Sequence, residues 1–498
     1  MNTPDISLNS CQQNALDSML AFLDTPSRRV FILNGYAGTG KTTLMRFLIS
    51  RLRKQKRPYH LLSTTGRAAK ILANYTGEDA RTIHSMIYSF KDLNKDLSDI
   101  SLSATNVDST GQLFLVFEPA TLQSSHNPNI YIIDEASMIS DTEVRHVTQA
   151  QFGTGRLLKE LFDYDPNPDS KFIFVGDPCQ LPPVSGAFSP ALSKSYINTA
   201  FSADANEACL TQIMRQADNA ALINASSKLR TLWSNAPETA EEYAGNKVWG
   251  MLPFRQCPNI HLHADMDTML THYIDNIRAH GYNHSVLICR SNADCVKISQ
   301  SVRQSLGFNR SLCEGDLLMV IQNQMTTGLM NGDMVEIVSM CPESERTYHD
   351  VKCEGIVTHL VFREVKVREL FTQTEHTTLL LESTILQQQN NLDSRQQSGL
   401  FLDFVMRMKR LGITQKKDGG SLFRSAMQSD PYLNALRCAY GYAVTCHKAQ
   451  GGEWNEVYIH LGARNFTLNP TKATYQWIYT ALTRGKNAVH MIDDFYIR

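Results

Sequence analysis

The chain has 498 residues, too many for one hydrophobic core, so roughly two to four domains are expected. Hydrophobic residues make up 42% and charged residues 19%, an ordinary globular balance, and no apolar run is long enough to span a bilayer. The net charge of −1 excludes a uniformly basic surface, so any contact with nucleic acid must be local. Because no basic-then-apolar leader opens the sequence, a cytoplasmic protein without a membrane partner is expected.

The 11 cysteines are odd in number and scattered, with no Cys-x-x-Cys pair and no cluster of histidines and cysteines at zinc spacing. Reduced thiols are therefore expected, without a disulfide framework or a structural zinc site.

The first element with a chemical signature is a predicted strand at 28–34, which leads through a glycine-rich turn into a predicted helix. The turn, NGYAGTGKTT at 34–43, contains the pattern G-x-x-x-x-G-K-[ST], in which backbone N–H groups cradle phosphates at a helix N-terminus. The lysine of this pattern reaches the terminal phosphates, and the hydroxyl binds magnesium. The predicted nucleotide contacts are Gly35, Ala37, Gly38, Thr39, Gly40, Lys41, Thr42 and Thr43.

Short apolar runs separated by helical stretches predict parallel strands of α/β sheets. One group lies before about residue 200 and another after 280, which predicts two α/β cores. The runs occupy residues 60–64, 129–135, 171–177, 285–291, 456–461 and 488–493.

Two segments interrupt this pattern. Residues 88–128 are polar apart from LFLVFE, which predicts a small insertion in the first core. Residues 341–435 alternate polar and apolar positions and predict an inserted, partly β module with exposed loops. The expected domains are the first core at 1–205, the second core at 206–340 and 436–498, and the inserted module at 341–435.

Several polar side chains suit nucleotide hydrolysis. In YIIDEAS, Asp134 can hold magnesium and Glu135 can orient and deprotonate the attacking water. In VGDPCQLPPV, Gln180 follows a strand end, where its amide can sense the γ-phosphate or the water. Arg215 and Arg484 are candidates for neutralising transition-state charge, with a surface salt bridge as the alternative for each.

A further pattern is the order of short stretches between residues 8 and 486. These are LNSCQQNAL, GYAGTGKT, STTGRAAK, ARTIHSMI, IIDEAS, VGDPCQLPPV, LTQIMRQ, LICRSN, MNGDMVEIV, VTCHKAQGGEW and YTALTRGK. In this order they resemble the motifs of superfamily 1B DNA helicases of the RecD- and Dda-like group, with a UvrD-like C-terminal core. The resemblance implies an α/β fold of two RecA-like P-loop domains, with ATP between them and Mg²⁺ as its partner ion. It also implies an inserted pin element and, in the partly β module, an SH3-like fold.

The resemblance assigns roles at the nucleotide site beyond the P-loop and the carboxylate pair. Gln12 matches the glutamine that recognises adenine, and Gln180 matches the one that couples the state of ATP to DNA. Arg215 and Arg484 match two arginine fingers, one on each core. Glu453 matches an acidic residue near the nucleotide in the second core.

Family positions that line the track of single-stranded DNA also have counterparts. Hydroxyl, amide and cationic donors suit phosphate contacts, which fix the strand without selecting sequence. Each position has an alternative as a helix cap or a packed core side chain. The matching residues are Thr65, Arg67, Thr82, His84, Asn292, Thr445, His447 and Lys448.

The parts that would separate strands match the family less well. Thr64 stands where the family usually has proline, which changes the turn before a DNA contact. The insertion at 88–128 takes the place of the pin, and Phe114 and Phe117 are candidates for its wedge. The alternative is that these two rings form a small core inside the pin.

The favoured function is an ATP-dependent DNA helicase that moves 5′ to 3′ on single-stranded DNA as a monomer and opens single-strand/double-strand junctions. It would serve DNA replication, recombination or repair, with no motif that selects among them. One alternative is a DNA-dependent ATPase that remodels protein–DNA complexes or drives a larger assembly without unwinding. Another is a nucleotide-gated scaffold or P-loop kinase, against which Arg215, Arg484 and Glu453 argue because a kinase needs no second core.

Overall fold

The structure is a computed structural model of the chain. It describes residues 7–26, 28–93, 115–123, 127–143, 150–184, 186–214, 220–239, 242, 252–353, 356–386, 392–462, 470–494 and 496–498. Across these ranges, no helix combines the length and the apolar character needed to pass through a membrane.

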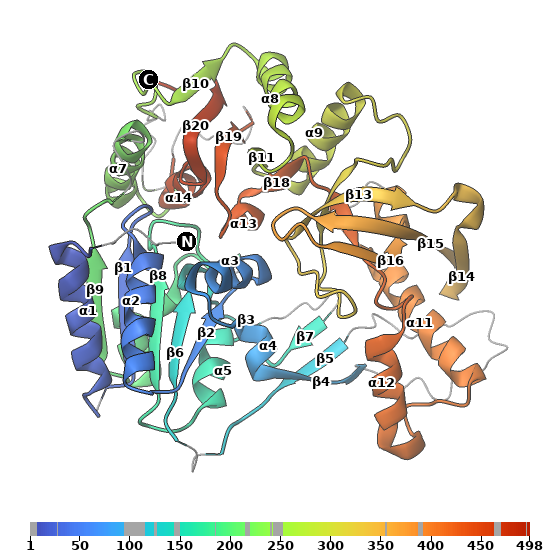
Figure 1. Cartoon of the computed structure of the whole chain (residues 1–498), viewed down its shortest axis with the longest axis horizontal. Helices are drawn as coiled ribbons and strands as arrows, with labels where there is room; N and C mark the ends of the chain where they lie inside the picture. The colour runs from blue at the N-terminus through green and yellow to red at the C-terminus, as the bar shows by residue number, and fades with distance from the viewer. Residues whose placement is uncertain are drawn as a thin grey trace.

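The first core is a six-stranded sheet in the order β3-β2-β6-β8-β1-β9, in which all neighbours run parallel (Figure 1). Its central strands are buried on both faces, as expected for a parallel sheet covered by helices. One apolar cluster lies under α1, α2 and α3, and another under α4, α5 and α6. The strands are β1 (Val30–Gly35), β2 (Tyr59–Ser63), β3 (Ala80–Thr82), β6 (Ile130–Asp134), β8 (Lys171–Gly176) and β9 (Ala205–Leu210). The helices are α1 (Ser10–Leu23), α2 (Lys41–Lys54), α3 (Gly66–Thr76), α4 (Ile83–Ile87), α5 (Leu157–Tyr164) and α6 (Lys194–Phe201), with short 3-10 turns η1 (Ala136–Met138) and η2 (Pro190–Leu192).

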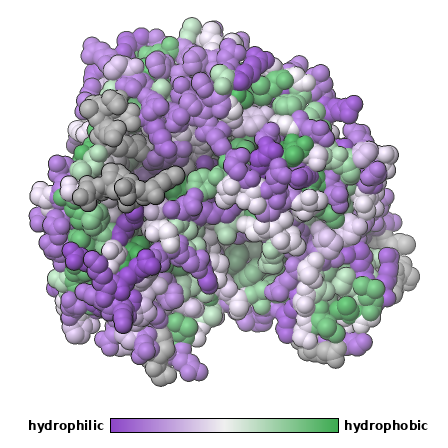
Figure 2. All heavy atoms as spheres, viewed as in Figure 1, coloured by the Kyte–Doolittle hydropathy of each residue, from purple (hydrophilic) through white to green (hydrophobic). Residues whose placement is uncertain are grey.

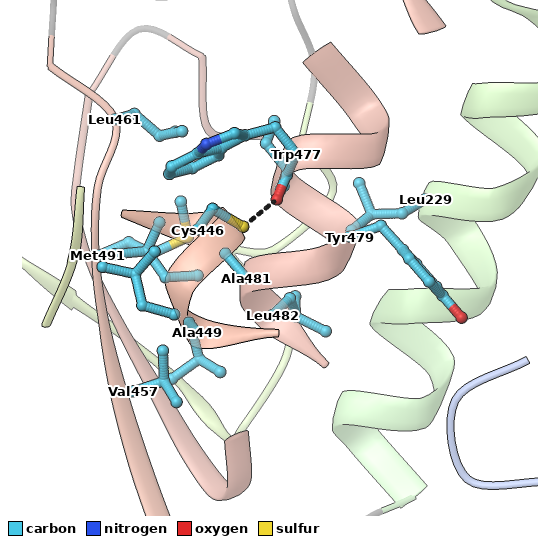
Figure 3. Packing of buried hydrophobic residues seen from close by; sticks show 14 of the residues in the cluster. Leu229, Cys446, Ala449, Val457, Leu461, Trp477, Tyr479, Ala481, Leu482 and Met491 are labelled. Atoms are coloured by element: carbon cyan, nitrogen blue, oxygen red, sulfur yellow. Dashed lines mark hydrogen bonds between the residues drawn. The ribbon is translucent and has the colours of Figure 1, made fainter. Parts of the chain in front are cut away.

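The second core is a five-stranded parallel sheet in the order β10-β20-β19-β11-β18. One face packs on α7, α13 and α14, where Trp477 and Tyr479 of α14 join the apolar cluster shown in Figure 3. The other face packs on α8 and α9. The strands are β10 (Ile260–His263), β11 (Ser285–Cys289), β18 (Ala443–Thr445), β19 (Trp454–His460) and β20 (Gly485–Ile492). The helices are α7 (Ala220–Asn235), α8 (Met266–His280), α9 (Asn292–Ser305), α13 (Cys446–Ala449) and α14 (Lys472–Leu482).

The inserted module is an antiparallel sheet in the order β14-β15-β13-β12-β17, with β16 paired to β15. Helix α11 packs on β14 and β15 through Leu400, Phe401 and Phe404. The strands are β12 (Leu317–Val320), β13 (Met334–Met340), β14 (Thr347–Cys353), β15 (Ile356–Glu369), β16 (Glu375–Leu381) and β17 (Cys438–Tyr440). The helices are α10 (Ser383–Leu386), α11 (Ser394–Arg410) and α12 (Ser421–Ser429), with 3-10 turns η5 (Glu343–Glu345) and η6 (Lys417–Gly420). Figure 2 shows that the face in view is mostly hydrophilic, with an apolar patch at the lower right, where α12 lies in Figure 1.

A small three-stranded sheet forms the other insertion. Strand β4 (Tyr88–Leu93) pairs antiparallel with β5 (Leu115–Pro119), which pairs parallel with β7 (Ala150–Phe152). The segment 94–114 between β4 and β5 lies outside the described residues. The insertion therefore recruits a strand from residue 150, beyond the end predicted at 128.

Two predicted boundaries differ from the sheets. Residue 205 starts β9, which pairs with β1, so the first sheet extends to Leu210. The antiparallel sheet begins at Leu317 and ends at Tyr440, wider than 341–435, because β12 and β17 pair with each other and hold the two ends of the insertion together. A partly β module and two parallel α/β cores agree with the predicted fold class, while the SH3-like assignment stays a prediction.

Candidate nucleotide site and DNA path

The phosphate-binding loop joins β1 to α2 and contains two glycines in left-handed conformations, Gly38 (φ 80°) and Gly40 (φ 79°). A Cβ atom at Gly40 would lie 2.4 Å from Nε2 of Gln12, so a larger residue would displace the end of the Gln12 side chain and would also strain the backbone. Gln12 is buried, and its Nε2 donates to the carbonyl of Thr39 at 3.0 Å. The loop therefore packs directly on the glutamine predicted to recognise adenine.

Lys41 is the first residue of α2. Its ammonium group donates to the carbonyls of Gly35 at 2.7 Å and Tyr36 at 3.3 Å, which holds it across the loop. Thr42 follows in the first turn of the helix. The N-terminus of α2, a cation and a hydroxyl thus meet at one place, which suits a phosphate chain with a bound cation.

The carboxylate pair lies at the end of β6. Glu135 adopts a left-handed conformation (φ 51°), and its N–H donates to Oδ1 of Asp134 at 2.9 Å. Burial, and next the charge of Glu135, raise the pKa of Asp134 to about 7, although Lys41 opposes this shift. Too little positive charge lies near this carboxylate to offset its negative charge. The site therefore suits a divalent cation, which Thr42 and Asp134 would hold. When bound, Mg²⁺ would neutralise phosphate charge.

Gln180 lies in the loop after β8 and is buried. Its Oε1 has no hydrogen-bond partner among the residues that the structure describes. Its backbone carbonyl accepts from Nε2 of Gln476, on α14 of the second core, at 3.2 Å. A buried oxygen without a hydrogen-bond partner destabilises the folded protein, so this amide suits a site where a bound ligand supplies the partner. The backbone of Gln180 is meanwhile held by the second core.

Arg484 and Glu453 approach from the second core. Arg484 is buried and donates to the carbonyl of Thr480 at 3.1 Å and to that of Gly452 at 3.3 Å. The carboxylate of Glu453 lies 3.9 Å from the ammonium of Lys486. Both line the same cleft as the P-loop, and this cleft encloses about 530 Å³, within the range of roughly 300–1,000 Å³ typical of small-molecule sites. Its lining includes Ala37, Gly38, Gly40, Lys41, Thr42, Thr43, Asp134, Glu135, Gln180, Glu453 and Arg484.

Tyr479 is a site residue that the sequence analysis missed. Its hydroxyl accepts from the N–H of Ala37 in the P-loop at 3.1 Å and donates to Oδ2 of Asp177 at 2.7 Å. In Figure 3 the ring lies beside Leu229, and the hydroxyl points away from the apolar cluster toward the first core. The stretch WIYTALTRGK carries this residue five positions before Arg484, but an apolar helix gives no sign of a contact across the cleft.

Arg67 lies between the predicted DNA path and the nucleotide cleft. Its guanidinium stacks over the ring of Trp454 at 4.6 Å and lines the cleft. Burial is the main cause that lowers its pKa to about 10, opposed by the charges of Asp333 and Glu369. This cation from the first core therefore faces groups of the second core and of the inserted module.

The other first-core residues predicted to bind DNA have structural roles in this conformation. The hydroxyls of Thr65 and Thr82 cap α3 and α4 by accepting from Ala68 at 3.2 Å and Ser85 at 3.1 Å. The ring of His84 meets Phe152 edge to face at 5.0 Å, and burial lowers its pKa to about 4.

Three second-core residues predicted to bind DNA share a separate hollow beside α9. Asn292, Thr445 and Lys448 line it together with Tyr440. Burial lowers the pKa of Lys448, and it also lowers that of His447. The structure thus gathers three of the four second-core residues, whereas His84 packs on Phe152 of the small sheet.

The remaining predicted residues divide into two cases. Arg215 and Phe114 lie outside the described residues. Phe117 pairs with Phe90 across β4 and β5 and stacks on Phe152 at 4.6 Å. This packing favours the small-core alternative for Phe117 over a wedge.

Comparison with known proteins gives matches to two family domains. Residues 7–245 match the AAA domain, and residues 440–492 match the UvrD-like helicase C-terminal domain. The first contains the P-loop, the carboxylate pair and Gln180, and the second contains Glu453 and Arg484. The two domains follow each other in the same order as the sequence motifs.

Individual relatives differ in how much they cover. The ATP-dependent DNA helicase Dda of Enterobacteria phage T4 is 27% identical over 505 residues, which cover 98% of this chain and 99% of Dda. The uncharacterised protein R530 of Acanthamoeba polyphaga mimivirus is 25% identical over 188 residues, and this chain spans only 33% of its length. A Pif1 helicase from Bacteroides, solved with ADP-AlF3 and single-stranded DNA, is 17% identical with a TM-score of 0.46, covering 99% of this chain and 93% of that one. The two matched domains, in motif order, together with a helicase relative that aligns from end to end, fit a superfamily 1B helicase, an ATP-hydrolysing enzyme.

Proposed function

We propose that the chain is an ATP-dependent DNA helicase that moves 5′ to 3′ along single-stranded DNA and opens the duplex ahead of it. The observation that carries this proposal is the single cleft that collects the P-loop and carboxylates of one core and Arg484 and Glu453 of the other. Such a site is complete only when both cores contribute, so binding and hydrolysis of a nucleotide change how the cores meet. The end-to-end match to a DNA helicase supports the same substrate here.

Each side chain has a role that follows from its chemistry. Lys41 binds the terminal phosphates, and Glu135 takes the proton of the attacking water. Gln180 senses the water or the γ-phosphate through its free Oε1. Arg484 neutralises charge in the transition state from the second core, and we propose the same role for Arg215, which lies outside the described residues. Gln12 holds adenine, and Mg²⁺ is the proposed ion at Thr42 and Asp134.

The proposed DNA path has two parts, one on each core. Thr65, Arg67, Thr82 and His84 form the first part, and Asn292, Thr445, His447 and Lys448 form the second. The hollow shared by Asn292, Thr445 and Lys448 supports the second part because an amide, a hydroxyl and an ammonium converge there without an acidic neighbour among its lining residues. The first part requires a change in conformation, because its threonine hydroxyls act as caps here.

Direction, cell compartment and assembly complete the proposal. The 5′ to 3′ direction rests on the resemblance to superfamily 1B. We propose that the protein works in the cytoplasm. We also propose that it works as a monomer, because one chain supplies both halves of the nucleotide cleft.

The experiment measures ATP hydrolysis by the purified protein with and without single-stranded DNA, beside Lys41→Ala. We expect DNA to stimulate hydrolysis about tenfold or more, which is the effect that a typical coupling free energy between two sites produces. We expect Lys41→Ala to abolish hydrolysis, because the ammonium of Lys41 lies across the P-loop, where the terminal phosphates bind. Unwinding of 5′-tailed and 3′-tailed duplexes follows on the same preparation, and only the 5′-tailed substrate should open.

Three outcomes would change this assignment. Stimulation without opening of either duplex would favour the motor that remodels protein–DNA complexes. Opening of the 3′-tailed substrate alone would overturn the direction. Hydrolysis that is indifferent to DNA would contradict the proposed DNA path.

A further inference from the structure

Histidines gather on one face of the second sheet, at its β10 edge. His261 and His263 alternate along β10, so both point to the same face, and His490 on β20 pairs in register with His261. Helix α8 covers this face and adds His272, as the neighbouring β10, β20 and α8 in Figure 1 illustrate. Further along the same face the core is mainly apolar.

Three of these rings bring nitrogen atoms close together. Nε2 of His263 lies 3.0 Å from Nδ1 of His490. One ring nitrogen from each of His263, His272 and His490 lies within 4.8 Å of one from each of the others. Three nitrogens bound tetrahedrally at about 2.0–2.1 Å from an ion would be about 3.3–3.4 Å apart. Small side-chain rotations therefore suffice to bring the three histidine nitrogens to these distances.

Polar groups lie beside two of the rings. Nε2 of His490 is 3.2 Å from Oε2 of Glu456 but makes no hydrogen bond among the described residues, and Nδ1 of His272 lies 2.8 Å from the hydroxyl of Tyr458. That hydroxyl in turn donates to Oε2 of Glu456 at 3.2 Å. Histidines that bind metals usually have a carboxylate or another polar group on the second nitrogen, which fixes the ring and directs the first nitrogen at the ion.

The three rings differ in exposure. His490 is buried, whereas His272 is exposed, so an ion could enter past α8.

We propose that His263, His272 and His490 form a binding site for one divalent transition-metal ion of the zinc class, with water at the fourth position. Imidazole ligands suit zinc, copper, nickel and iron, and a set of three histidines without carboxylate ligands does not suit magnesium or calcium. The ion would hold the edge strand β10 and strand β20 to α8. None of the three ligands lines the nucleotide cleft, so this site is independent of the proposed helicase activity.

The test adds Co²⁺ to the full-length protein after dialysis against a chelator. Co²⁺ bound in tetrahedral geometry gives intense visible absorption, and we expect one equivalent per chain. His272→Ala removes an exposed ligand with little risk to folding and should abolish the absorption. His280→Ala removes another exposed histidine of the same helix, whose ring stacks on His284 and not on the cluster, and should retain it.

A second measurement compares thermal unfolding with and without Zn²⁺. Saturating Zn²⁺ should raise the melting temperature of the wild type and of His280→Ala, and it should leave that of His272→Ala unchanged, because an ion that binds only the folded state stabilises it. Equal Co²⁺ binding by His272→Ala and the wild type would overturn the proposal. Absorption dominated by cobalt–thiolate charge transfer would also overturn it, because the ion would then lie at cysteines.

Discussion

Gly40 is constrained at the residue scale by its backbone and by its neighbour. Its φ of 79° lies in the left-handed region, and a Cβ atom there would lie 2.4 Å from Nε2 of Gln12. We expect Gly40→Ala to displace Gln12 and to weaken nucleotide binding at least about tenfold, since adenine contact and loop shape change together. Titration with a fluorescent ATP analogue measures the effect.

Gly77 supplies the matched control for this substitution. Its φ of 71° is also left-handed, but a Cβ atom there would meet nothing within 4 Å. Gly77→Ala should cost about 1–2 kcal/mol of folding free energy through backbone strain and leave nucleotide affinity unchanged. Equal nucleotide affinity in Gly40→Ala and the wild type would show that contact between Gln12 and the loop is unimportant.

Tyr479 links the two cores through one hydroxyl. Removing it in Tyr479→Phe leaves the N–H of Ala37 without its acceptor and takes one donor from the buried carboxylate of Asp177. We expect a loss of about 1–3 kcal/mol in stability and a weaker response of ATP hydrolysis to DNA. Thermal unfolding and the ratio of hydrolysis with and without DNA measure the two effects. Tyr348→Phe, at a side chain that is 60% exposed, is the control, and identical behaviour of the two variants would contradict the link.

At the scale of elements, the chemistry of the first core could be predicted because it depends on local sequence. The apolar strands β1, β6 and β8 end in the P-loop, the carboxylate pair and the loop of Gln180, so spacing alone located them. Strand β10 was missed because the sequence IHLH alternates histidine with apolar residues and is only four residues long.

Helix α11 was missed for a different reason. Its first turns are rich in glutamine, which suggested an exposed loop, yet Gln396 and Gln397 are buried. A usable signal was present, because Asp393 and Gln396 form a capping box at the start of this helix. Contacts such as Tyr479 to Ala37 could not be predicted, since they depend on how two separate cores meet.

The small sheet allows a test of whether Phe117 is a strand-separating wedge or part of a small hydrophobic core. Phe117 lies between Phe90 and Phe152, so Phe117→Ala should cost about 1–3 kcal/mol, less than a fully buried phenylalanine. Phe117→Leu keeps most of the volume and should cost less than about 1.5 kcal/mol, with unwinding per ATP unchanged. Thermal unfolding and unwinding assays on both variants measure this. A normal melting temperature with a large loss of unwinding in Phe117→Leu would instead identify the ring as the wedge.

At the scale of the whole molecule, α3 contacts both the second core and the inserted module. Its residue Lys70 forms an ion pair with Asp333, just before β13 of the inserted module. Its neighbour Arg67 stacks on Trp454 of the second core. Movement of α3 on nucleotide binding therefore acts on the second core and on the inserted module together, which suits an enzyme that couples hydrolysis to strand separation.

The pair of Lys70 and Asp333 gives the last prediction. The side chain of Asp333 is 2% exposed, and its Oδ2 also accepts from the N–H of Met330 at 2.8 Å. Lys70→Met leaves this carboxylate buried without its cation and should cost about 3 kcal/mol. The double variant Lys70→Met/Asp333→Asn should recover most of that loss, because the buried carboxylate without its ammonium partner is gone.

The exposed pair of Lys91 and Glu118 on β4 and β5 is the control. Both side chains are more than half exposed, at 55% and 53%, so Lys91→Met should cost no more than about 1 kcal/mol. Chemical unfolding measures how much of the loss in Lys70→Met the double variant recovers. Unwinding per ATP should fall in Lys70→Met and in the double variant alike, because both lose the link from α3 to the inserted module. A double variant that is no more stable than Lys70→Met would mean that the buried charge is not the cause. Normal unwinding in the double variant would mean that α3 transmits its movement through Arg67 and Trp454 instead.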